Sequence, residues 1–198
     1  MRIGVLAVQG SFSLHSRVLS SLGIEPVEIR RSSDMTDISG IILPGGESTA
    51  FQIIMDSDNL GDYLRRELRT GLPAWGTCAG AIMLGRSTAG NPFPGWDLID
   101  IEVVRNGYGR QVDSFVAPLR ITGFESDFNG VFIRAPIFLN PGRGVDVLAE
   151  FDGEPVMARQ DNLLVTSFHP ELTSDTRVHR YFLQEFCAQS NLSNIKSA

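Results

Sequence analysis

The sequence predicts an α/β protein with three layers: a mostly parallel central sheet flanked by helices, with a small antiparallel or mixed portion. Short apolar runs, typical of strands buried on both faces, alternate with helix-favouring segments up to Arg86. Beyond Arg86, strand-like segments follow one another without helices between them. The 198 residues are 42% hydrophobic, which is enough to bury a core, and they show no linker or repeat. We therefore expect a single domain over residues 1–198.

The segments before Arg86 are predicted to form repeated β-α units, which give a parallel sheet with right-handed crossovers. Ser11 is placed to cap a helix that Gly23 ends. Apolar residues at helical spacing mark another helix from Leu60 to Leu68. The predicted strands cover residues 3–8, 26–30, 41–43 and 72–75, and the helices cover 12–22, 50–55 and 60–68, with a further helix around 81–84.

The later segments predict strands at 98–104, 114–119, 130–133, 145–151, 156–159 and 163–168. Asp161-Asn162 is typical of a tight hairpin turn between the last two. A final helix is expected to begin near Thr173 or Ser174, with Val178, Tyr181, Phe182 and Phe186 on its buried side.

Charge and cysteine content narrow the class of partner. The formal net charge of −6 disfavours nucleic acid and anionic membranes, because both bind basic surfaces. Cys78 and Cys187 are too few for a disulfide framework and favour a reducing compartment. No stretch approaches the roughly 20 apolar residues of a membrane span. We expect a cytoplasmic protein with no nucleic-acid or membrane partner.

The stretch Gly76-Thr77-Cys78-Ala79-Gly80 has the pattern of a nucleophile elbow, a sharp turn from a strand into a helix. Its glycines allow a tight backbone that a Cβ would crowd. Cys78 would then lie at a helix N-terminus, where free N–H groups favour a thiolate. On this stretch alone, a buried structural cysteine is an equal alternative, because free cysteines are commonly buried.

A thiolate needs a base, and His169 is the candidate among the three histidines. It follows an apolar strand, and functional side chains collect at the C-terminal ends of parallel strands. Pro170 favours extended backbone, so Glu171 is expected to point the same way as His169 and bond one ring nitrogen. The alternative is a His-Pro turn with an exposed glutamate. His15 and His179 are expected on helix surfaces.

A third turn, Pro44-Gly45-Gly46-Glu47-Ser48-Thr49, also lies between a strand and a helix. Its glycines let backbone N–H groups point at a ligand, but it lacks the lysine of a phosphate-binding loop. Beside a nucleophilic cysteine, it is better placed to supply an oxyanion donor from Gly45 or Gly46, with the N–H of Ala79 as the second donor. A Gly-rich turn capped by Ser48 is the alternative.

The elbow and His169-Pro170-Glu171 together resemble a class I, or triad, glutamine amidotransferase, whose fold is flavodoxin-like. Further blocks narrow the resemblance to the glutaminase subunits of two-protein pyridoxal 5'-phosphate synthases. These blocks span nearly the whole chain: Ala7-Val8-Gln9-Gly10, Pro44-Gly45-Gly46-Glu47-Ser48-Thr49, Arg105-Asn106-Gly107-Tyr108-Gly109-Arg110-Gln111, Phe132-Ile133-Arg134-Ala135-Pro136 and His169-Pro170-Glu171-Leu172-Thr173.

The resemblance implies hydrolysis of L-glutamine to L-glutamate and ammonia. It further implies transfer of the ammonia to a (β/α)8-barrel synthase subunit in a large hetero-oligomer, and low activity without that partner. By matched position, Cys78 is the nucleophile, His169 the general base and acid, and Glu171 its orienter. The matched glutamine-binding residues are Gly46, Glu47, Ser48, Arg105, Ile133 and Arg134.

The chemistry of these residue types agrees with the resemblance. The planar fork of an arginine suits a substrate carboxylate, and Glu47 suits an ammonium group. Without the resemblance, a surface ion pair is the simpler role for Arg105 and for Arg134. No cofactor is expected, and no Cys/His cluster indicates a metal.

Two other functions stay open at this point. One is a triad glutaminase that serves a different synthase, in histidine, purine or folate biosynthesis. The other is a non-catalytic α/β module whose Cys78 responds to redox state. The first would differ in the partner it binds, and the second would turn over no glutamine.

Overall fold

The structure, a computed structural model, describes residues 1–8, 10–46, 59–86, 95–105 and 114–188. Its centre is a seven-stranded sheet. Five neighbouring strands of this sheet run parallel, and the two strands at one edge pair in antiparallel fashion. In spatial order the strands are β2 (Glu25–Ile29), β1 (Arg2–Leu6), β3 (Ile41–Leu43), β4 (Ala74–Thr77), β11 (Leu163–Thr166), β10 (Glu154–Gln160) and β9 (Asp146–Phe151).

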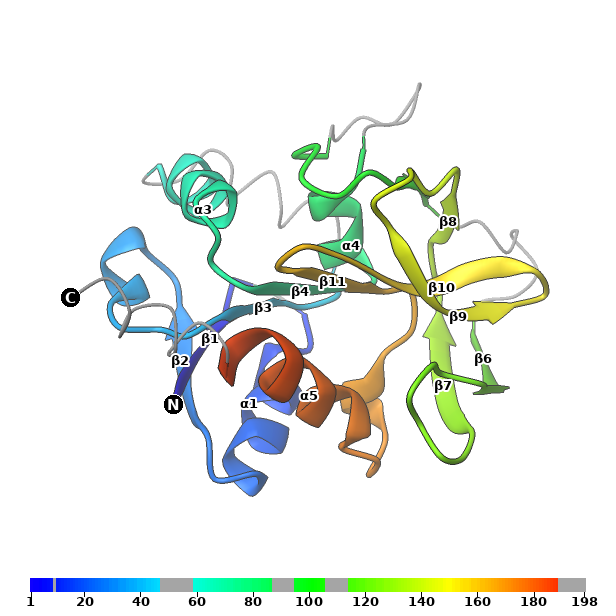
Figure 1. The fold of residues 1–198 in the computed structure, drawn as a ribbon. Helices are drawn as coiled ribbons and strands as arrows, with labels where there is room; N and C mark the ends of the chain where they lie inside the picture. The colour runs from blue at the N-terminus through cyan, green and yellow to red at the C-terminus, as the bar shows by residue number, and fades with distance from the viewer. Residues whose placement is uncertain (9, 47–58, 87–94, 106–113, 189–198) are drawn as a thin grey trace.

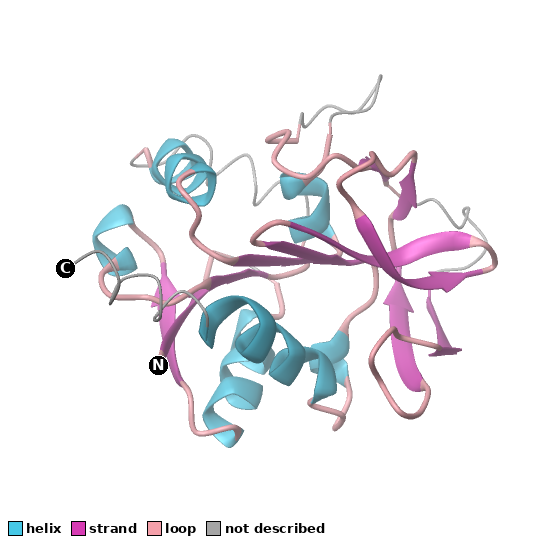
Figure 2. Cartoon of the chain, in the orientation of Figure 1, coloured by secondary structure: helices cyan, strands magenta, loops and turns pink. Residues whose placement is uncertain are grey.

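Helices cover both faces of this sheet and give the molecule its three layers (Figures 1 and 2). On one face lie α1 (Phe12–Ser21) and α5 (Arg177–Phe182), which continues into the π-helical turn η3 (Leu183–Cys187). On the other face lie α3 (Leu60–Arg69) and α4 (Ala79–Leu84). A 3-10 turn, η1 (Ser32–Met35), follows β2.

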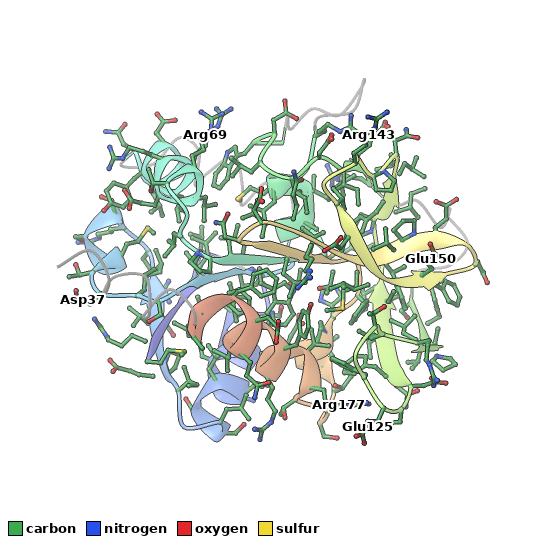
Figure 3. All side chains as sticks on the ribbon, viewed as in Figure 1. Asp37, Arg69, Glu125, Arg143, Glu150 and Arg177 are labelled. Carbon is green, nitrogen blue, oxygen red and sulfur yellow. The ribbon has the colours of Figure 1, made fainter. Side chains whose placement is uncertain are left out.

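The two faces of the sheet carry separate cores. Alternate residues of a strand point to opposite faces, so Ile42 packs with α1 and α5, whereas Ile41 and Leu43 pack with α3 and α4. Figure 3 shows the labelled charged residues, Asp37, Arg69, Glu125, Arg143, Glu150 and Arg177, around the rim of the molecule. The inner strands of the sheet are apolar on both faces because helices cover both faces.

Two small antiparallel pairs extend the β10–β9 side of the sheet (Figure 1). In one, β5 (Glu102–Val104) pairs with β8 (Ile137–Leu139). In the other, β6 (Ser114–Leu119) pairs with β7 (Phe128–Ile133), and Phe115 stacks on Phe132 across the pair. The predicted fold class, a parallel α/β sheet with an added antiparallel portion, is therefore confirmed.

Three local predictions were wrong in informative ways. Strand β5 begins at Glu102, because the N–H groups of Trp96 and Leu98 bond the C-terminal end of α4 instead of a strand. Strand β8 was missed. Helix α5 begins at Arg177, later than expected, because Asp175 Oδ1 accepts the Arg177 N–H and holds a turn before the helix. The helix predicted at 50–55 lies outside the described residues.

Within the described ranges, no helix combines the length and apolar character needed to cross a bilayer.

Candidate active site

Sheet pairing brings Cys78 and His169 together. Strands β4 and β11 are parallel neighbours with Thr77 opposite Thr166, so the chain leaves both strands at the same edge of the sheet. The N–H of Cys78 donates to the carbonyl of Thr166 over 2.8 Å. On the other side of β4 lies β3, whose end leads into Gly45. Three strand ends therefore converge at Cys78, as is usual for functional sites in parallel sheets.

Cys78 occupies the strained turn that the elbow pattern predicts. Its φ of 50° and ψ of −104° are unusual for a residue with a Cβ, and such strain costs about 1–3 kcal/mol. Helix α4 begins at the next residue, and the Ala81 and Ile82 N–H groups donate to the Cys78 carbonyl. A Cβ on Gly76 would lie 2.6 Å from the Gly80 backbone, so the turn requires its glycines.

The two cysteines differ in accessibility. Cys78 is partly exposed, whereas Cys187 is buried and its burial raises the pKa of that thiol to about 12. Thiols react as thiolates, so Cys187 has the features of an inert structural cysteine and Cys78 does not.

His169 and Glu171 form a buried pair. The Nδ1 atom of His169 lies 2.8 Å from Oε1 of Glu171, which is only 4% exposed. The exposed-glutamate alternative is therefore wrong. The expected extended backbone is also wrong beyond His169, because Pro170–Leu172 is a 3-10 turn (η2) that folds Glu171 back toward the ring. The His169 N–H donates to the Val131 carbonyl, which ties the turn to β7.

Burial and hydrogen bonding set the charges of this pair. Burial lowers the pKa of His169, but its bonds to Cys78 and Glu171 outweigh burial and raise that pKa to about 10. Burial raises the pKa of Glu171, but His15, His169 and Ser11 outweigh it and lower that pKa to about 2. At neutral pH the site thus holds an imidazolium between a carboxylate and the Cys78 side chain.

Ser11, which precedes α1, and His15, within α1, both contact Glu171, and sequence reasoning missed both contacts. Ser11 Oγ makes no helix-capping bond and instead donates to Glu171 Oε1 over 2.5 Å. His15 is fully buried, with Nε2 3.4 Å from Glu171 Oε2. His179, on α5, is 1% exposed. The prediction that His15 and His179 lie on helix surfaces is wrong, because each lies on its helix's buried stripe, with Leu19 or Phe182 one turn further on.

Gly45 lies close to the Cys–His pair. Its N–H donates to Thr77 Oγ1 over 2.9 Å, so this group already has an acceptor, and the oxyanion donor expected from this turn stays a prediction. A Cβ on Gly45 would lie 2.6 Å from His169 Cε1 and 3.2 Å from Cys78 Cβ. Gly45 is therefore the residue that lets the third strand end approach the Cys–His pair. Glu47 and Ser48 lie outside the described residues.

The predicted arginines lie at one end of the small sheets. Ile133 ends β7 and is 37% exposed, and Arg134 follows it with φ of 42°. Arg105 follows Val104, which pairs with Ile137 just beyond Arg134. The His169 N–H donates to the carbonyl of Val131, two residues before the end of β7. The hydrogen bond therefore places the end of β7, and Arg134 after it, near His169. Within the described ranges, no group of three His, Cys, Asp or Glu is arranged to hold a metal.

The fold is that of the class I glutamine amidotransferases. A solved structure described as a glutamine amidotransferase superimposes with a TM-score of 0.86 at 44% identity, covering 92% of this chain and 97% of that one. The structure of PurLQS from Thermotoga maritima, matched at 16% identity, shares the fold with a TM-score of 0.67, covering 93% of this chain and 97% of that one.

The chain belongs to the SNO glutamine amidotransferase family, whose sequence profile matches residues 5–188. It is 46% identical to the pyridoxal 5'-phosphate synthase subunit PdxT of Thermosipho africanus, covering 92% of this chain and 97% of that protein. It is 47% identical to the PdxT subunit of Carboxydothermus hydrogenoformans, covering 94% of this chain and 98% of that protein. The family resemblance predicted from the sequence blocks is confirmed.

Proposed function

We propose that the chain hydrolyses L-glutamine to L-glutamate and ammonia as the glutaminase subunit of a pyridoxal 5'-phosphate synthase. One observation supports this chemistry above the rest: the converging strand ends place Cys78 beside His169, whose Nδ1 lies 2.8 Å from the buried Glu171 carboxylate. Similarity to PdxT subunits over more than nine-tenths of the chain supports the pathway.

The reaction begins with Cys78. Its thiolate attacks the side-chain amide carbon of glutamine, and the resulting oxyanion accepts hydrogen bonds from the N–H groups of Ala79 and Gly46. His169, which holds its proton at neutral pH, passes that proton to the departing nitrogen, so ammonia leaves and a thioester remains. His169 is then neutral and takes a proton from the attacking water. Hydrolysis releases glutamate and restores the thiolate–imidazolium pair.

Substrate recognition falls to residues around the ends of β5 and β7. Arg105 and Arg134 bind the α-carboxylate through their planar guanidinium groups, and Ile133 contacts the aliphatic part of glutamine. Gly46, Glu47 and Ser48 complete the site, with Glu47 pairing with the substrate ammonium.

The ammonia passes to a synthase subunit of the (β/α)8-barrel type in a large hetero-oligomer in the cytoplasm. The chain acts as one domain without a cofactor, and its activity is low until the synthase binds. No feature of the described residues favours a histidine, purine or folate synthase as partner, or a redox-sensing module.

The test is a glutamate-release assay with and without a purified barrel synthase, with Cys78→Ala as the matched control. The proposal expects release that rises when the synthase is added and disappears in Cys78→Ala. Activation by a synthase of another pathway would redirect the proposal to that pathway. Turnover that survives Cys78→Ala would refute the chemistry.

A further inference from the structure

A buried polar cluster lies behind the catalytic glutamate. His15 of α1 and His179 of α5 are 0% and 1% exposed, and their ring atoms Nδ1 and Nε2 lie 3.0 Å apart. Trp75 of β4 contacts both rings edge-on, with centroids 5.4 Å and 4.8 Å away. Buried histidines without a metal need hydrogen-bond partners, and the mechanism above uses neither of them.

The two oxygens of Glu171 face different partners. Oε1 accepts from Ser11 Oγ and lies 2.8 Å from His169 Nδ1. Oε2 is buried, has no formed hydrogen bond among the described residues and faces His15 Nε2 at 3.4 Å. An ionised buried oxygen needs a donor, and bonds in catalytic sites often tighten only when substrate binds. The group placed to donate is the His15 ring.

The direction of the hydrogen bonds follows from the carboxylate. Were the proton on His15 Nδ1, a lone pair on Nε2 would face a second lone pair on Glu171 Oε2. The favourable tautomer carries the proton on Nε2, which leaves Nδ1 to accept from the Nε2–H of His179. The Nδ1 of His179 has no partner among the described residues, and a bare acceptor there leaves no buried N–H unpaired. Both rings then donate toward Glu171.

Both rings are neutral in this arrangement. Burial lowers the pKa of His15, and the charge of His169 adds to burial, although Glu171 opposes them. Burial and His15 lower the pKa of His179 to about 3. A neutral imidazole held in one tautomer donates a hydrogen bond in one fixed direction. Histidines that bind metals are held in the same way, because a hydrogen bond at the second ring nitrogen fixes the tautomer and the ring orientation.

We propose that His15 is a positioning residue for Glu171, donating Nε2–H to Oε2, and that His179 fixes the tautomer of His15 from behind. Ser11, at the N-cap of α1, and His15, one turn into the helix, thereby hold both oxygens of the carboxylate so that Oε1 meets His169 Nδ1. The inference rests on the proposed glutaminase function for its kinetic consequence, and on the geometry of α1, η2 and α5 for the hydrogen bonds.

The first test uses the unaltered protein. Histidine ring ¹⁵N spectra report tautomer and charge directly. At neutral pH the inference expects His15 and His179 both neutral with the proton on Nε2, assigned with His15→Gln and His179→Gln. A His15 ring that is protonated on Nδ1, or that is cationic, overturns it. This measurement needs no turnover, so it stands apart from the outcome of the glutaminase assay.

The second test compares two amides at position 15 in the complex with the synthase. The side-chain amide introduced by His15→Gln reaches the position of Nε2, facing Glu171, whereas that of His15→Asn matches Nδ1 and faces His179. We expect His15→Asn to lose about 10- to 100-fold in kcat with KM for glutamine unchanged, and His15→Gln to recover most of that loss.

Leu19→Ala is the matched control, since Leu19 is fully buried on the same helix one turn beyond His15. It should lower the melting temperature while leaving kcat near that of the unaltered protein. Equal kcat losses in His15→Gln, His15→Asn and Leu19→Ala would show a structural role only and overturn the inference. If the unaltered complex releases no glutamate, the proposed function fails, and the ¹⁵N spectra still decide the hydrogen bonds.

Discussion

The carbonyl of Thr166 accepts the N–H of Cys78 over 2.8 Å, which joins the elbow to the strand that leads to His169. This bond extends the parallel pairing of β4 and β11 by one residue beyond their last paired residues, Thr77 and Thr166. Cys78 and His169 are far apart in the chain, and it is the pairing of two parallel strands that makes them neighbours. Any change at this edge of the sheet should therefore affect the chemistry before it affects the fold.

Replacing Gly45 tests how closely the third strand end approaches the pair. In Gly45→Ala the new Cβ would lie 2.6 Å from His169 Cε1 and 3.2 Å from Cys78 Cβ, so the imidazole must move. Because a displacement of about 1 Å at a catalytic group can cost about 100-fold, we expect a kcat loss of that order in a folded protein. Steady-state glutamate release measures the kcat loss, and a melting curve shows whether the variant is folded.

Gly144→Ala is the control for that substitution. A Cβ on Gly144 would meet only Gln160, at the ordinary contact distance of 3.4 Å. The Gly144→Ala variant should therefore have the same kcat as the unaltered protein. Similar losses in the two variants would mean that the Gly45 contact with His169 does not limit the reaction.

Thr77 should matter for stability through its hydroxyl group. Thr77 is fully buried and its Oγ1 accepts the Gly45 N–H, so Thr77→Val leaves that N–H buried without an acceptor. A lost buried partner of this kind costs about 1–3 kcal/mol. Urea unfolding should show that decrease for Thr77→Val and a much smaller one for Thr77→Ser, which keeps the hydroxyl. Equal stability of the two variants would rule out the bond as the cause.

The elbow and the strand ends were predictable because local residue types encode them. The pairing of Glu171 with His169 was also expected, but the 3-10 turn that brings it about was not. The glycines at 76 and 80 are required by the turn, and apolar runs mark the strands on either side. The burial of His15 and His179 could have been found from their spacing to Leu19 and Phe182. His179 was instead assigned to the polar side of the stripe formed by Val178, Tyr181 and Phe182, and that assignment was wrong because the side chain is 1% exposed.

Other features could not be predicted from the sequence. The Ser11–Glu171 bond joins α1 to η2, and no local pattern encodes a contact over that sequence separation. The same is true of the Gly45–Thr77 bond, which joins the end of β3 to β4. Strand β8 has only three residues and is defined by its pairing with β5 rather than by a pattern of its own.

The neutral histidine on α5 should make the protein sensitive to acid. Burial and His15 lower the pKa of His179 to about 3, whereas in the unfolded chain it is near the ordinary value of 6.5. Below pH 6.5 the unfolded chain binds a proton that the folded one does not, so this residue lowers stability progressively as pH falls from about 6.5 toward 3.

His179→Gln keeps an amide donor toward His15 and removes that titration. We expect the variant to lose less unfolding free energy than the unaltered protein between about pH 7 and about pH 5, measured by urea denaturation. Arg180→Gln, at the exposed neighbouring position, should lose as much as the unaltered protein. An identical acid sensitivity in His179→Gln would contradict the assignment of a buried neutral His179.

Arg134 should act on substrate binding rather than on the chemical step. Arg134→Gln removes the guanidinium that we propose pairs with the substrate carboxylate, and hydrogen bonds to charged groups contribute about 1.5–3 kcal/mol. We expect KM for glutamine to rise about 10- to 100-fold with a smaller change in kcat. Arg120→Gln is the control, because Arg120 is exposed and pairs only loosely with Asp127 at 3.4 Å. A KM unchanged by Arg134→Gln would remove this residue from the glutamine site.

The central claim is that Cys78 forms an acyl intermediate with glutamine, and peptide mapping by mass spectrometry tests it most directly. The complex with the synthase is quenched in acid during turnover, digested and searched for a glutamyl group. The account predicts that the group is attached to the Cys78 peptide, with none on Cys187 and none anywhere in Cys78→Ala. A glutamyl group on another residue, or glutamate release by Cys78→Ala at the normal rate, would contradict it.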